Sequence, residues 1–235
     1  MSTVPSPTPH AHHLRVRRTA RYYTLGGASG GVRTVWVVLH GYSQLAAVFI
    51  RFFSDLAGPD SLVLAPEALN RYYLVGPEAG AATERPVGAT WMTREDRASE
   101  ISDYVEYLDT LYDEVILEHA RSGARVAVVG FSQGAATATR WLMHGRASID
   151  RLILWGGLLP PETDISAANA RLRGTPLTIV VGTRDRYIDE ESLGLEIARL
   201  GAAKLPCDLI RFDGGHVITR GVFPRLREAS GVCDR

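Results

Sequence analysis

Short, unbroken apolar runs recur along the chain and alternate with segments of helical periodicity. The runs cover residues 34–39, 61–65, 125–129, 152–155, 177–181 and 207–212. Runs of this length are typical of strands covered on both faces, as in a parallel sheet. We therefore predict a buried strand at each of these positions.

Helical patterns follow most of these runs. They predict helices over residues 46–56, 133–143, 193–200 and 222–227. The longest pattern covers residues 93–116, and Thr93 with Asp96 fits the Ser/Thr-x-x-Asp/Glu capping pattern that marks a helix start. Strands that alternate with helices in this way predict a mainly parallel central sheet with helices on both faces.

Three further segments complete the predicted domain. Two short strands over residues 14–18 and 21–25 lie close enough in sequence to form an antiparallel hairpin at one edge of the sheet. Residues 67–91 are rich in Gly, Pro and Ala and predict an irregular stretch, which in compact domains is often functional. We expect one domain over residues 14–235, preceded by a disordered tail over residues 1–13 that is rich in Pro, Ser, Thr and His.

The pattern Gly-x-Ser-x-Gly occurs twice, and its context differs between the two places. GASGG at 27–31 follows a short edge strand with no helix after it, which predicts a flexible loop. GFSQG at 130–134 lies between a buried strand and a helix, the context of a strained turn that lifts a nucleophilic serine above the sheet edge. We therefore predict Ser132, and not Ser29, as a nucleophile.

A serine hydroxyl needs a base, and the base needs an acid that orients it. In strand–turn–helix elbows the chain order is serine, acid, histidine. His216 is the only histidine well downstream of Ser132, and Asp185 lies in the loop after the run 177–181. We expect Asp189 to cap the next helix, while Asp213 is too close in sequence to His216 to reach its Nδ1 easily. The predicted catalytic residues are Ser132, Asp185 and His216.

Two backbone N–H groups are predicted to stabilise a developing oxyanion. One belongs to Gln133, directly after the nucleophile and at the start of a helix. The other belongs to Tyr42, in the loop after the run 34–39. His40 stands in the wrong place in the chain order for a catalytic base, so we expect it to brace this loop by hydrogen bonding.

Four motifs together resemble the α/β-hydrolase superfamily: VLHGY at 38–42, GFSQG at 130–134, GTRD at 182–185 and GGH at 214–216. Within it, FSQG and the compact length are similar to the phospholipase/carboxylesterase family, which includes acyl-protein thioesterases. The resemblance implies an α/β-hydrolase fold and the triad Ser132, Asp185 and His216. No long insertion separates residues 152–155 from 177–181, so no large lid domain is expected.

The resemblance also indicates where this chain departs from the family pattern. Members of the family often carry a tryptophan near the substrate pocket, ahead of the long helix, and Trp91 fits that place; a core aromatic is the equal alternative. The family usually has Leu or a similar residue where this chain has Tyr42, and a Val-Pro pair after the acid where it has Arg186 and Tyr187. Both changes lie at the rim of the predicted site and argue against a simple transfer of long acyl substrates.

These motifs predict a serine esterase that cleaves carboxylic esters through an acyl-serine intermediate. The alternatives are an acyl-thioesterase or lysophospholipase and, from another class, a ligand-binding receptor with the hydrolase fold and slow turnover. We expect a small-molecule ester as substrate and no cofactor, because the chain has no metal-ligand cluster, phosphate-binding glycine loop or nucleotide fingerprint.

The composition of the chain argues against several other functional classes. The formal net charge is zero, with 26 Lys and Arg against 26 Asp and Glu, which argues against a general nucleic-acid binder. No apolar run approaches the length of a membrane span, and the N-terminal residues lack the apolar stretch of a secretory signal, so we expect no stable membrane insertion. The two cysteines, Cys207 and Cys233, give no disulfide framework, and we expect a cytoplasmic protein.

Overall fold

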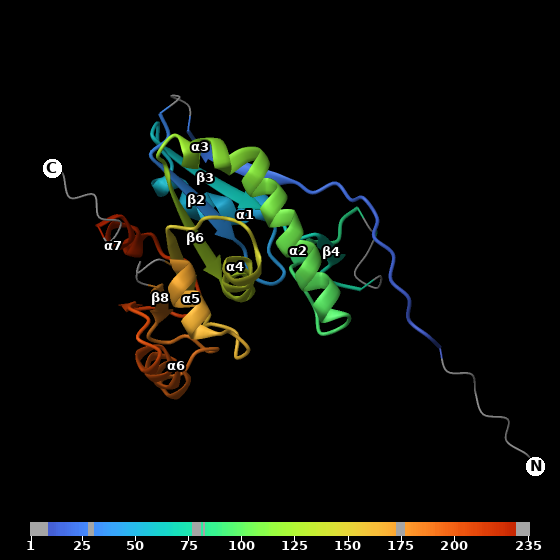
Figure 1. Ribbon diagram of the computed structural model, residues 1–235. Helices are drawn as coiled ribbons and strands as arrows, with labels where there is room; N and C mark the ends of the chain where they lie inside the picture. The colour runs from blue at the N-terminus through green and yellow to red at the C-terminus, as the bar shows by residue number, and fades with distance from the viewer. Residues whose placement is uncertain (1–8, 28–30, 77–80, 82, 173–176, 229–235) are drawn as a thin grey trace, which may run out of the picture.

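The computed structural model describes residues 9–27, 31–76, 81, 83–172 and 177–228. A seven-stranded sheet with the order β1-β3-β2-β6-β7-β8-β9 crosses this part of the chain (Figure 1). All neighbouring strands are parallel except β1 and β3. The mainly parallel sheet is therefore confirmed, and so are the predicted buried strands except at residues 207–212, where β9 lies at the sheet edge and only Ile210 is buried. The strands are β1 (Tyr22–Gly26), β2 (Thr34–Leu39), β3 (Ser61–Pro66), β6 (Arg125–Phe131), β7 (Arg151–Trp155), β8 (Leu177–Gly182) and β9 (Cys207–Phe212).

Helices cover both faces of the sheet because strand side chains alternate between the two faces (Figure 1). Val35 and Val37 pack in one core with α2, α4, α5 and α6, whereas Trp36 and Val38 pack in the other with α1, η1 and α7. The helical elements are α1 (Ala46–Phe49), η1 (Ile50–Leu56), α2 (Arg97–Leu111), η3 (Tyr112–Ile116), α3 (Leu117–Arg121), α4 (Gln133–His144), α5 (Ile165–Leu172), α6 (Glu190–Ala202), η4 (Arg220–Val222) and α7 (Phe223–Glu228).

The N-terminal edge differs from the predicted hairpin. The antiparallel strand β1 pairs with β3, and Tyr22 lies opposite Pro66. Residues 14–18 form no strand; this segment runs outside the sheet, where Arg15 forms an ion pair with Glu106 of α2 at 2.6 Å. Within the predicted disordered tail, residues 1–8 lie outside the described part, and His13 contacts Asp96 at 3.0 Å.

The stretch 67–91 is more regular than its composition indicated. It contains a two-stranded antiparallel ribbon formed by β4 (Asn70–Tyr73) and β5 (Val87–Thr90). The ribbon packs beside the loop after β2, since the N–H of Ser43 donates to the carbonyl of Ala89 at 2.9 Å. Because β5 consists largely of small residues, its sequence did not predict a strand. The same small residues allow the ribbon to approach the loop after β2 closely.

The long helix starts later than its capping pattern predicted. Helix α2 begins at Arg97, after Asp96 in a left-handed conformation with φ of 45°. The Thr93 hydroxyl accepts from the N–H of Glu95 instead of capping the helix, so the predicted start at Thr93 is wrong. Among the described residues, no helix is both long enough and apolar enough to cross a membrane.

Candidate active site

Ser132 occupies the turn between β6 and α4 at the carboxyl edge of the central strands. Its backbone has φ of 54° and ψ of −116°, a conformation that residues with a side chain rarely adopt. The N–H of Ser132 donates to the carbonyl of Trp155 at the end of β7, at 2.9 Å. Strain of this kind persists only where the surroundings impose it, and here two sheet strands and a helix hold the turn.

The two glycines of GFSQG are needed because backbone segments approach each other closely. A Cβ at Gly130 would lie 2.3 Å from the carbonyl oxygen of Gly134, and one at Gly134 would lie 2.2 Å from the carbonyl oxygen of Leu39. Neither distance is compatible with a side chain. The other match to the pattern centres on Ser29, which lies outside the described residues.

His216 and Asp185 come together from the loops after β9 and β8. His216 Nδ1 lies 2.8 Å from Asp185 Oδ2, and the side chain of Asp185 is only 1% exposed. The other oxygen of Asp185 accepts from the N–H of Tyr187 at 2.9 Å. Asp189 caps α6 by accepting from the N–H of Ser192, as predicted, and Asp213 is exposed and paired with Arg184. Of the three candidate acids, Asp185 is the one that contacts His216.

The imidazole of His216 lies beside the turn that carries Ser132. Its ring centroid is 4.9 Å from that of Phe131, the residue before Ser132. A Cβ at Gly156 would lie 2.9 Å from His216 Cε1, and a Cβ at Gly157 would lie 3.0 Å from the carbonyl oxygen of Ser132. His216 Nε2 is buried and has no hydrogen-bond partner among the described residues. Because Nδ1 donates to the carboxylate, Nε2 carries the lone pair that can accept a proton.

His40 braces the loop after β2 with both of its ring nitrogens. Its Nε2 accepts from the N–H of Ala68 at 3.0 Å, so its Nδ1 carries the proton and donates to the carbonyl of Gly41 at 2.8 Å. Burial lowers the pKa of His40, which favours the neutral ring that this arrangement requires. The predicted hydrogen-bonding role of His40 is therefore confirmed by the geometry.

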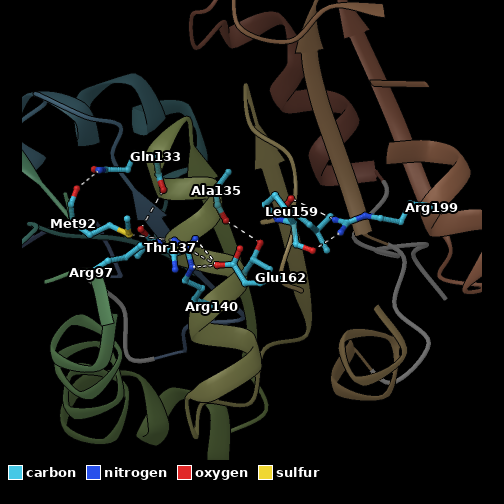
Figure 2. Close-up of polar contacts among 11 residues, drawn as sticks. Met92, Arg97, Gln133, Ala135, Thr137, Arg140, Leu159, Glu162 and Arg199 are labelled. Atoms are coloured by element: carbon cyan, nitrogen blue, oxygen red, sulfur yellow. Dashed lines mark hydrogen bonds and ion pairs between the residues drawn. The ribbon is translucent and has the colours of Figure 1, made fainter. Parts of the chain in front are cut away.

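The segments that carry the two predicted oxyanion donors both adjoin Ser132. The loop after β2 passes close to the nucleophile, because a Cβ at Gly41 would lie 3.2 Å from Ser132 Cβ, and Tyr42 follows directly. The N–H of Gln133 is the first of helix α4 and therefore has no partner within the helix. The Gln133 side chain fixes this position by donating to the carbonyl of Met92 at 2.8 Å (Figure 2).

Trp91 lies in the core below the loop that carries Tyr42. Only 2% of the residue is exposed, and its indole N–H donates to the carbonyl of His40 at 2.8 Å. The Trp91 backbone N–H also donates to Gln133 Oε1 at 3.0 Å. Trp91 thus supports both candidate oxyanion segments, one through its indole N–H and the other through its backbone N–H, and its buried ring offers almost no surface for a substrate.

The loop after β7 is held by ion pairs on one side and by a hydrogen bond on the other, and the sequence predicted neither. Glu162 accepts from Arg140 of α4 and from Arg97 of α2, at 2.8 Å and 2.5 Å (Figure 2). Partial burial opposes ionisation of Glu162, but hydrogen bonds from Arg140 and Arg97 lower its pKa to about 2. On the other side, the N–H of Leu159 donates to Glu196 of α6 at 3.0 Å. These partners lie far apart in the chain, so no local pattern could have predicted them.

Two exposed tyrosine rings at the rim of the candidate site were not predicted as contacts of its residues. Tyr187 follows the acid loop, is 63% exposed, and has its ring centroid 4.6 Å from that of His216. Tyr42 is 57% exposed and stacks on Tyr72 of the ribbon, with centroids 5.7 Å apart. The only signal in the sequence was that both places depart from the pattern of the family it resembles. Within the described ranges, no group of three or more His, Cys, Asp or Glu residues could hold a metal ion.

Comparison with protein families gives one match that covers most of the chain. The sequence model described as "Serine hydrolase (FSH1)" matches residues 35–221. This range contains the candidate nucleophile, acid and histidine as well as the loop with Tyr42. No curated relative matches the sequence.

Solved structures share the fold at low sequence identity. Esterase PE8 aligns with a TM-score of 0.59 and 22% identity over 90% of this chain and 100% of its own. Acyl-protein thioesterase 2 of Zea mays gives 0.63 and 16%, covering 89% and 97%, and the Bacillus cereus carboxylesterase gives 0.63 and 16%, covering 89% and 92%. At these identities the similarity confirms the predicted α/β-hydrolase fold without a large lid.

Proposed function

The chain belongs to the serine hydrolase family FSH1, and we propose that it hydrolyses carboxylic esters through an acyl-serine intermediate. The observation that carries the proposal is the contact between His216 Nδ1 and Asp185 Oδ2 at 2.8 Å beside the strained turn of Ser132. This contact fixes the ring and leaves the buried Nε2 as the acceptor. No cofactor is required for this chemistry.

In the first half of the reaction, Ser132 Oγ attacks the ester carbonyl while His216 Nε2 takes the hydroxyl proton. Asp185 stabilises the imidazolium that forms and keeps its own negative charge. The carbonyl oxygen becomes an oxyanion that accepts hydrogen bonds from the N–H groups of Tyr42 and Gln133. When the tetrahedral intermediate collapses, His216 returns the proton to the leaving alcohol and the acyl group stays on Ser132.

In the second half, a water molecule takes the place of the alcohol. His216 Nε2 accepts a proton from this water as it attacks the acyl carbon, and the same two N–H groups stabilise the second oxyanion. Collapse releases the carboxylic acid and returns the proton to Ser132 Oγ. In apo structures the link between nucleophile and base is often long, and it tightens when substrate excludes water. The orientation of His216 by Asp185 is therefore the observation that supports this mechanism.

Trp91 has a supporting role in this scheme. Its indole N–H and its backbone N–H hold the segments that carry Tyr42 and Gln133, through His40 and through the Gln133 side chain. We therefore assign it to positioning of the oxyanion donors, in preference to contact with the substrate.

The proposal is tested with p-nitrophenyl acetate and the variant Ser132→Ala. We expect kcat to fall by several powers of ten, because the other groups alone give only a small residual rate. Ser29→Ala is the matched control, since it removes the serine of the second Gly-x-Ser-x-Gly pattern and should keep full activity. Undiminished turnover in Ser132→Ala would refute the proposal. Stoichiometric labelling by a fluorophosphonate without turnover of any ester or thioester would instead favour the slow-turnover receptor.

We also propose a cytoplasmic location. Cys207 forms no disulfide within the described part of the chain, and burial raises its pKa to about 11, which keeps it protonated and unreactive. A reduced cysteine fits a reducing compartment. Cell fractionation that finds the protein outside the cytoplasm would contradict this assignment.

A further inference from the structure

We propose that Tyr187 determines specificity at this site and favours esters whose leaving alcohol carries an aromatic ring. The inference rests on the proposed esterase function, because it concerns the alcohol that His216 protonates. It is carried by the place of Tyr187 relative to His216 and by the exposure of its ring.

The ring of Tyr187 is tied to the candidate triad through its own backbone. The Tyr187 N–H donates to Asp185 Oδ1 at 2.9 Å, while Asp185 Oδ2 contacts His216 at 2.8 Å. One carboxylate therefore sets the position of both residues. The tyrosine and histidine rings meet edge to face, with centroids 4.6 Å apart and an interplanar angle of 71°.

The chemistry of the reaction decides which part of the substrate meets Tyr187. A histidine that protonates the leaving oxygen must lie within hydrogen-bond distance of it, so the alcohol portion lies next to His216. Two other neighbours of the His216 ring belong to the body of the protein: Phe131 is only 6% exposed, and Gly156 is backbone. Tyr187 is by contrast 63% exposed and offers its ring to a group that enters from solvent.

Arg186 orders this ring before a substrate arrives. Its guanidinium carbon lies 4.7 Å from the centroid of the Tyr187 ring, within the range of a cation–π contact. A ring that is already restricted loses little entropy when a ligand stacks on it. Aromatic pairs gain an interaction beyond the burial of apolar area, so an aromatic alcohol benefits more than an aliphatic alcohol of equal size.

The test compares two acetates that differ only in the alcohol, phenyl acetate and cyclohexyl acetate. The quantity measured is the ratio of the two kcat/KM values, and kcat/KM includes the step in which the alcohol leaves. The intrinsic reactivity of each ester is the same for every variant. It therefore cancels when the ratios of two variants are compared. In Tyr187→Leu, which keeps apolar bulk without the ring, we expect the phenyl/cyclohexyl ratio to fall about three- to tenfold. Tyr187→Phe keeps the ring and should hold the ratio within about twofold.

Tyr73→Leu is the matched control. Tyr73 is 46% exposed and has Arg85 at 4.1 Å from its ring centroid, but it lies on the β4–β5 ribbon. Its loss should leave the ratio unchanged. An unchanged ratio in Tyr187→Leu, an equal fall for both esters, or the same fall in Tyr73→Leu would overturn the inference alone. Absence of Ser132-dependent turnover of both acetates in the parent protein would overturn the proposed function and the inference with it.

Discussion

Both carboxylate oxygens of Asp185 have hydrogen-bond partners, and this distinguishes Asp185 from the other candidate acids. One oxygen contacts His216 and the other accepts from the N–H of Tyr187. Its side chain is almost completely buried, whereas Asp213 is 81% exposed. A buried carboxylate with both oxygens engaged has little freedom to move, as the orienting acid of a triad requires.

The first prediction compares Asp185 with its neighbour Asp189. Asp185→Asn should lower kcat by roughly three to four powers of ten, because an amide leaves His216 in the wrong tautomer. Asp189→Ala should keep kcat and lose about 1 kcal/mol of unfolding free energy, because it removes the cap of α6. Ester kinetics and urea unfolding of both variants check this. Equal activity of the two variants would rule out Asp185 as the orienting acid.

Residue identities at the candidate site were predictable because the chemistry restricts them. Ser132 needs a strand–turn–helix context, and few aspartates or histidines follow it in the required order. The contact between His216 and Asp185 agrees with the prediction, while their catalytic role stays a prediction. Tyr187 and Glu162 were not predictable as site residues, because Tyr187 contacts His216 of another loop and Glu162 contacts Arg140 of helix α4, and such distant contacts leave no local pattern.

At the scale of elements, two glycines allow helix α4 to pack directly against the backbone of the sheet. A Cβ at Gly130 would clash with the backbone of the next helical turn, and one at Gly134 would clash with the end of β2. Strand β6, the turn and α4 therefore form one unit. The turn cannot relax without separating the helix from the strands beneath it.

The second prediction follows from this close packing of α4 against the strands. Gly130→Ala should lower the free energy of unfolding by roughly 1–3 kcal/mol, because the added methyl group meets backbone atoms that cannot move aside cheaply. Gly194→Ala is the control: it lies in α6 with nothing within 4 Å of the added Cβ, and should gain up to about 1 kcal/mol. Urea denaturation checks both values. Equal stability of Gly130→Ala and the parent would show that the helix can shift.

Elements with a long, uniform pattern were predictable, and those decided by tertiary contacts were not. The central strands are buried on both faces, so apolar runs alone locate them. The ribbon strand β5 is short and built from small residues, and its pairing depends on β4 and on Ser43. Residues 14–18 resemble a strand locally, but they do not pair with the outer side of β1, and Arg15 pairs with Glu106 of α2 instead. Helix α5 was missed, although Ile165, Ala168 and Leu172 are buried at helical spacing.

At the scale of the whole molecule, Glu67 joins segments from three parts of the fold. Its buried carboxylate binds Arg21 before β1 at 2.6 Å and Arg71 of the ribbon at 3.0 Å, and it accepts from the N–H of Ala46 at the start of α1. Burial opposes ionisation of Glu67, yet hydrogen bonds from Arg21 and Arg71 lower its pKa below the ordinary value. His40 lies in the same buried region, and burial lowers its pKa as well.

The third prediction concerns stability against pH. The unfolded chain takes up a proton on His40 below about pH 6.5, while the folded protein keeps the ring neutral. The free energy of unfolding should therefore be level above that pH and fall as the pH drops below it, by at most about 1.4 kcal/mol per pH unit for one proton. Glu67 adds a loss of the same sign below about pH 4.5, because the folded state holds the carboxylate ionised.

Urea unfolding at pH 7.5, 6.5, 5.5 and 4 measures this profile. His40→Gln should flatten the step between pH 6.5 and 5.5, and it should also be less stable at pH 7.5, because it cannot serve both Ala68 and Gly41 as the imidazole does. Stability that rises on acidification from pH 6.5 to 5.5 in the parent protein would contradict the neutral state of His40.

The order of strands in the sheet also has a consequence for synthesis on the ribosome. The second neighbour of strand β2 is β6, where Thr34 lies opposite Arg125. The N–H of Ser132 donates to the carbonyl of Trp155, which belongs to the still later strand β7. A nascent chain thus carries β2 and β3 with an open edge while much of the domain is still untranslated. Non-local parallel pairing is slow, and unpaired edges invite association with other chains. The yield of active protein in a cell therefore depends on what shields that edge during translation, as well as on the stability of the finished sheet.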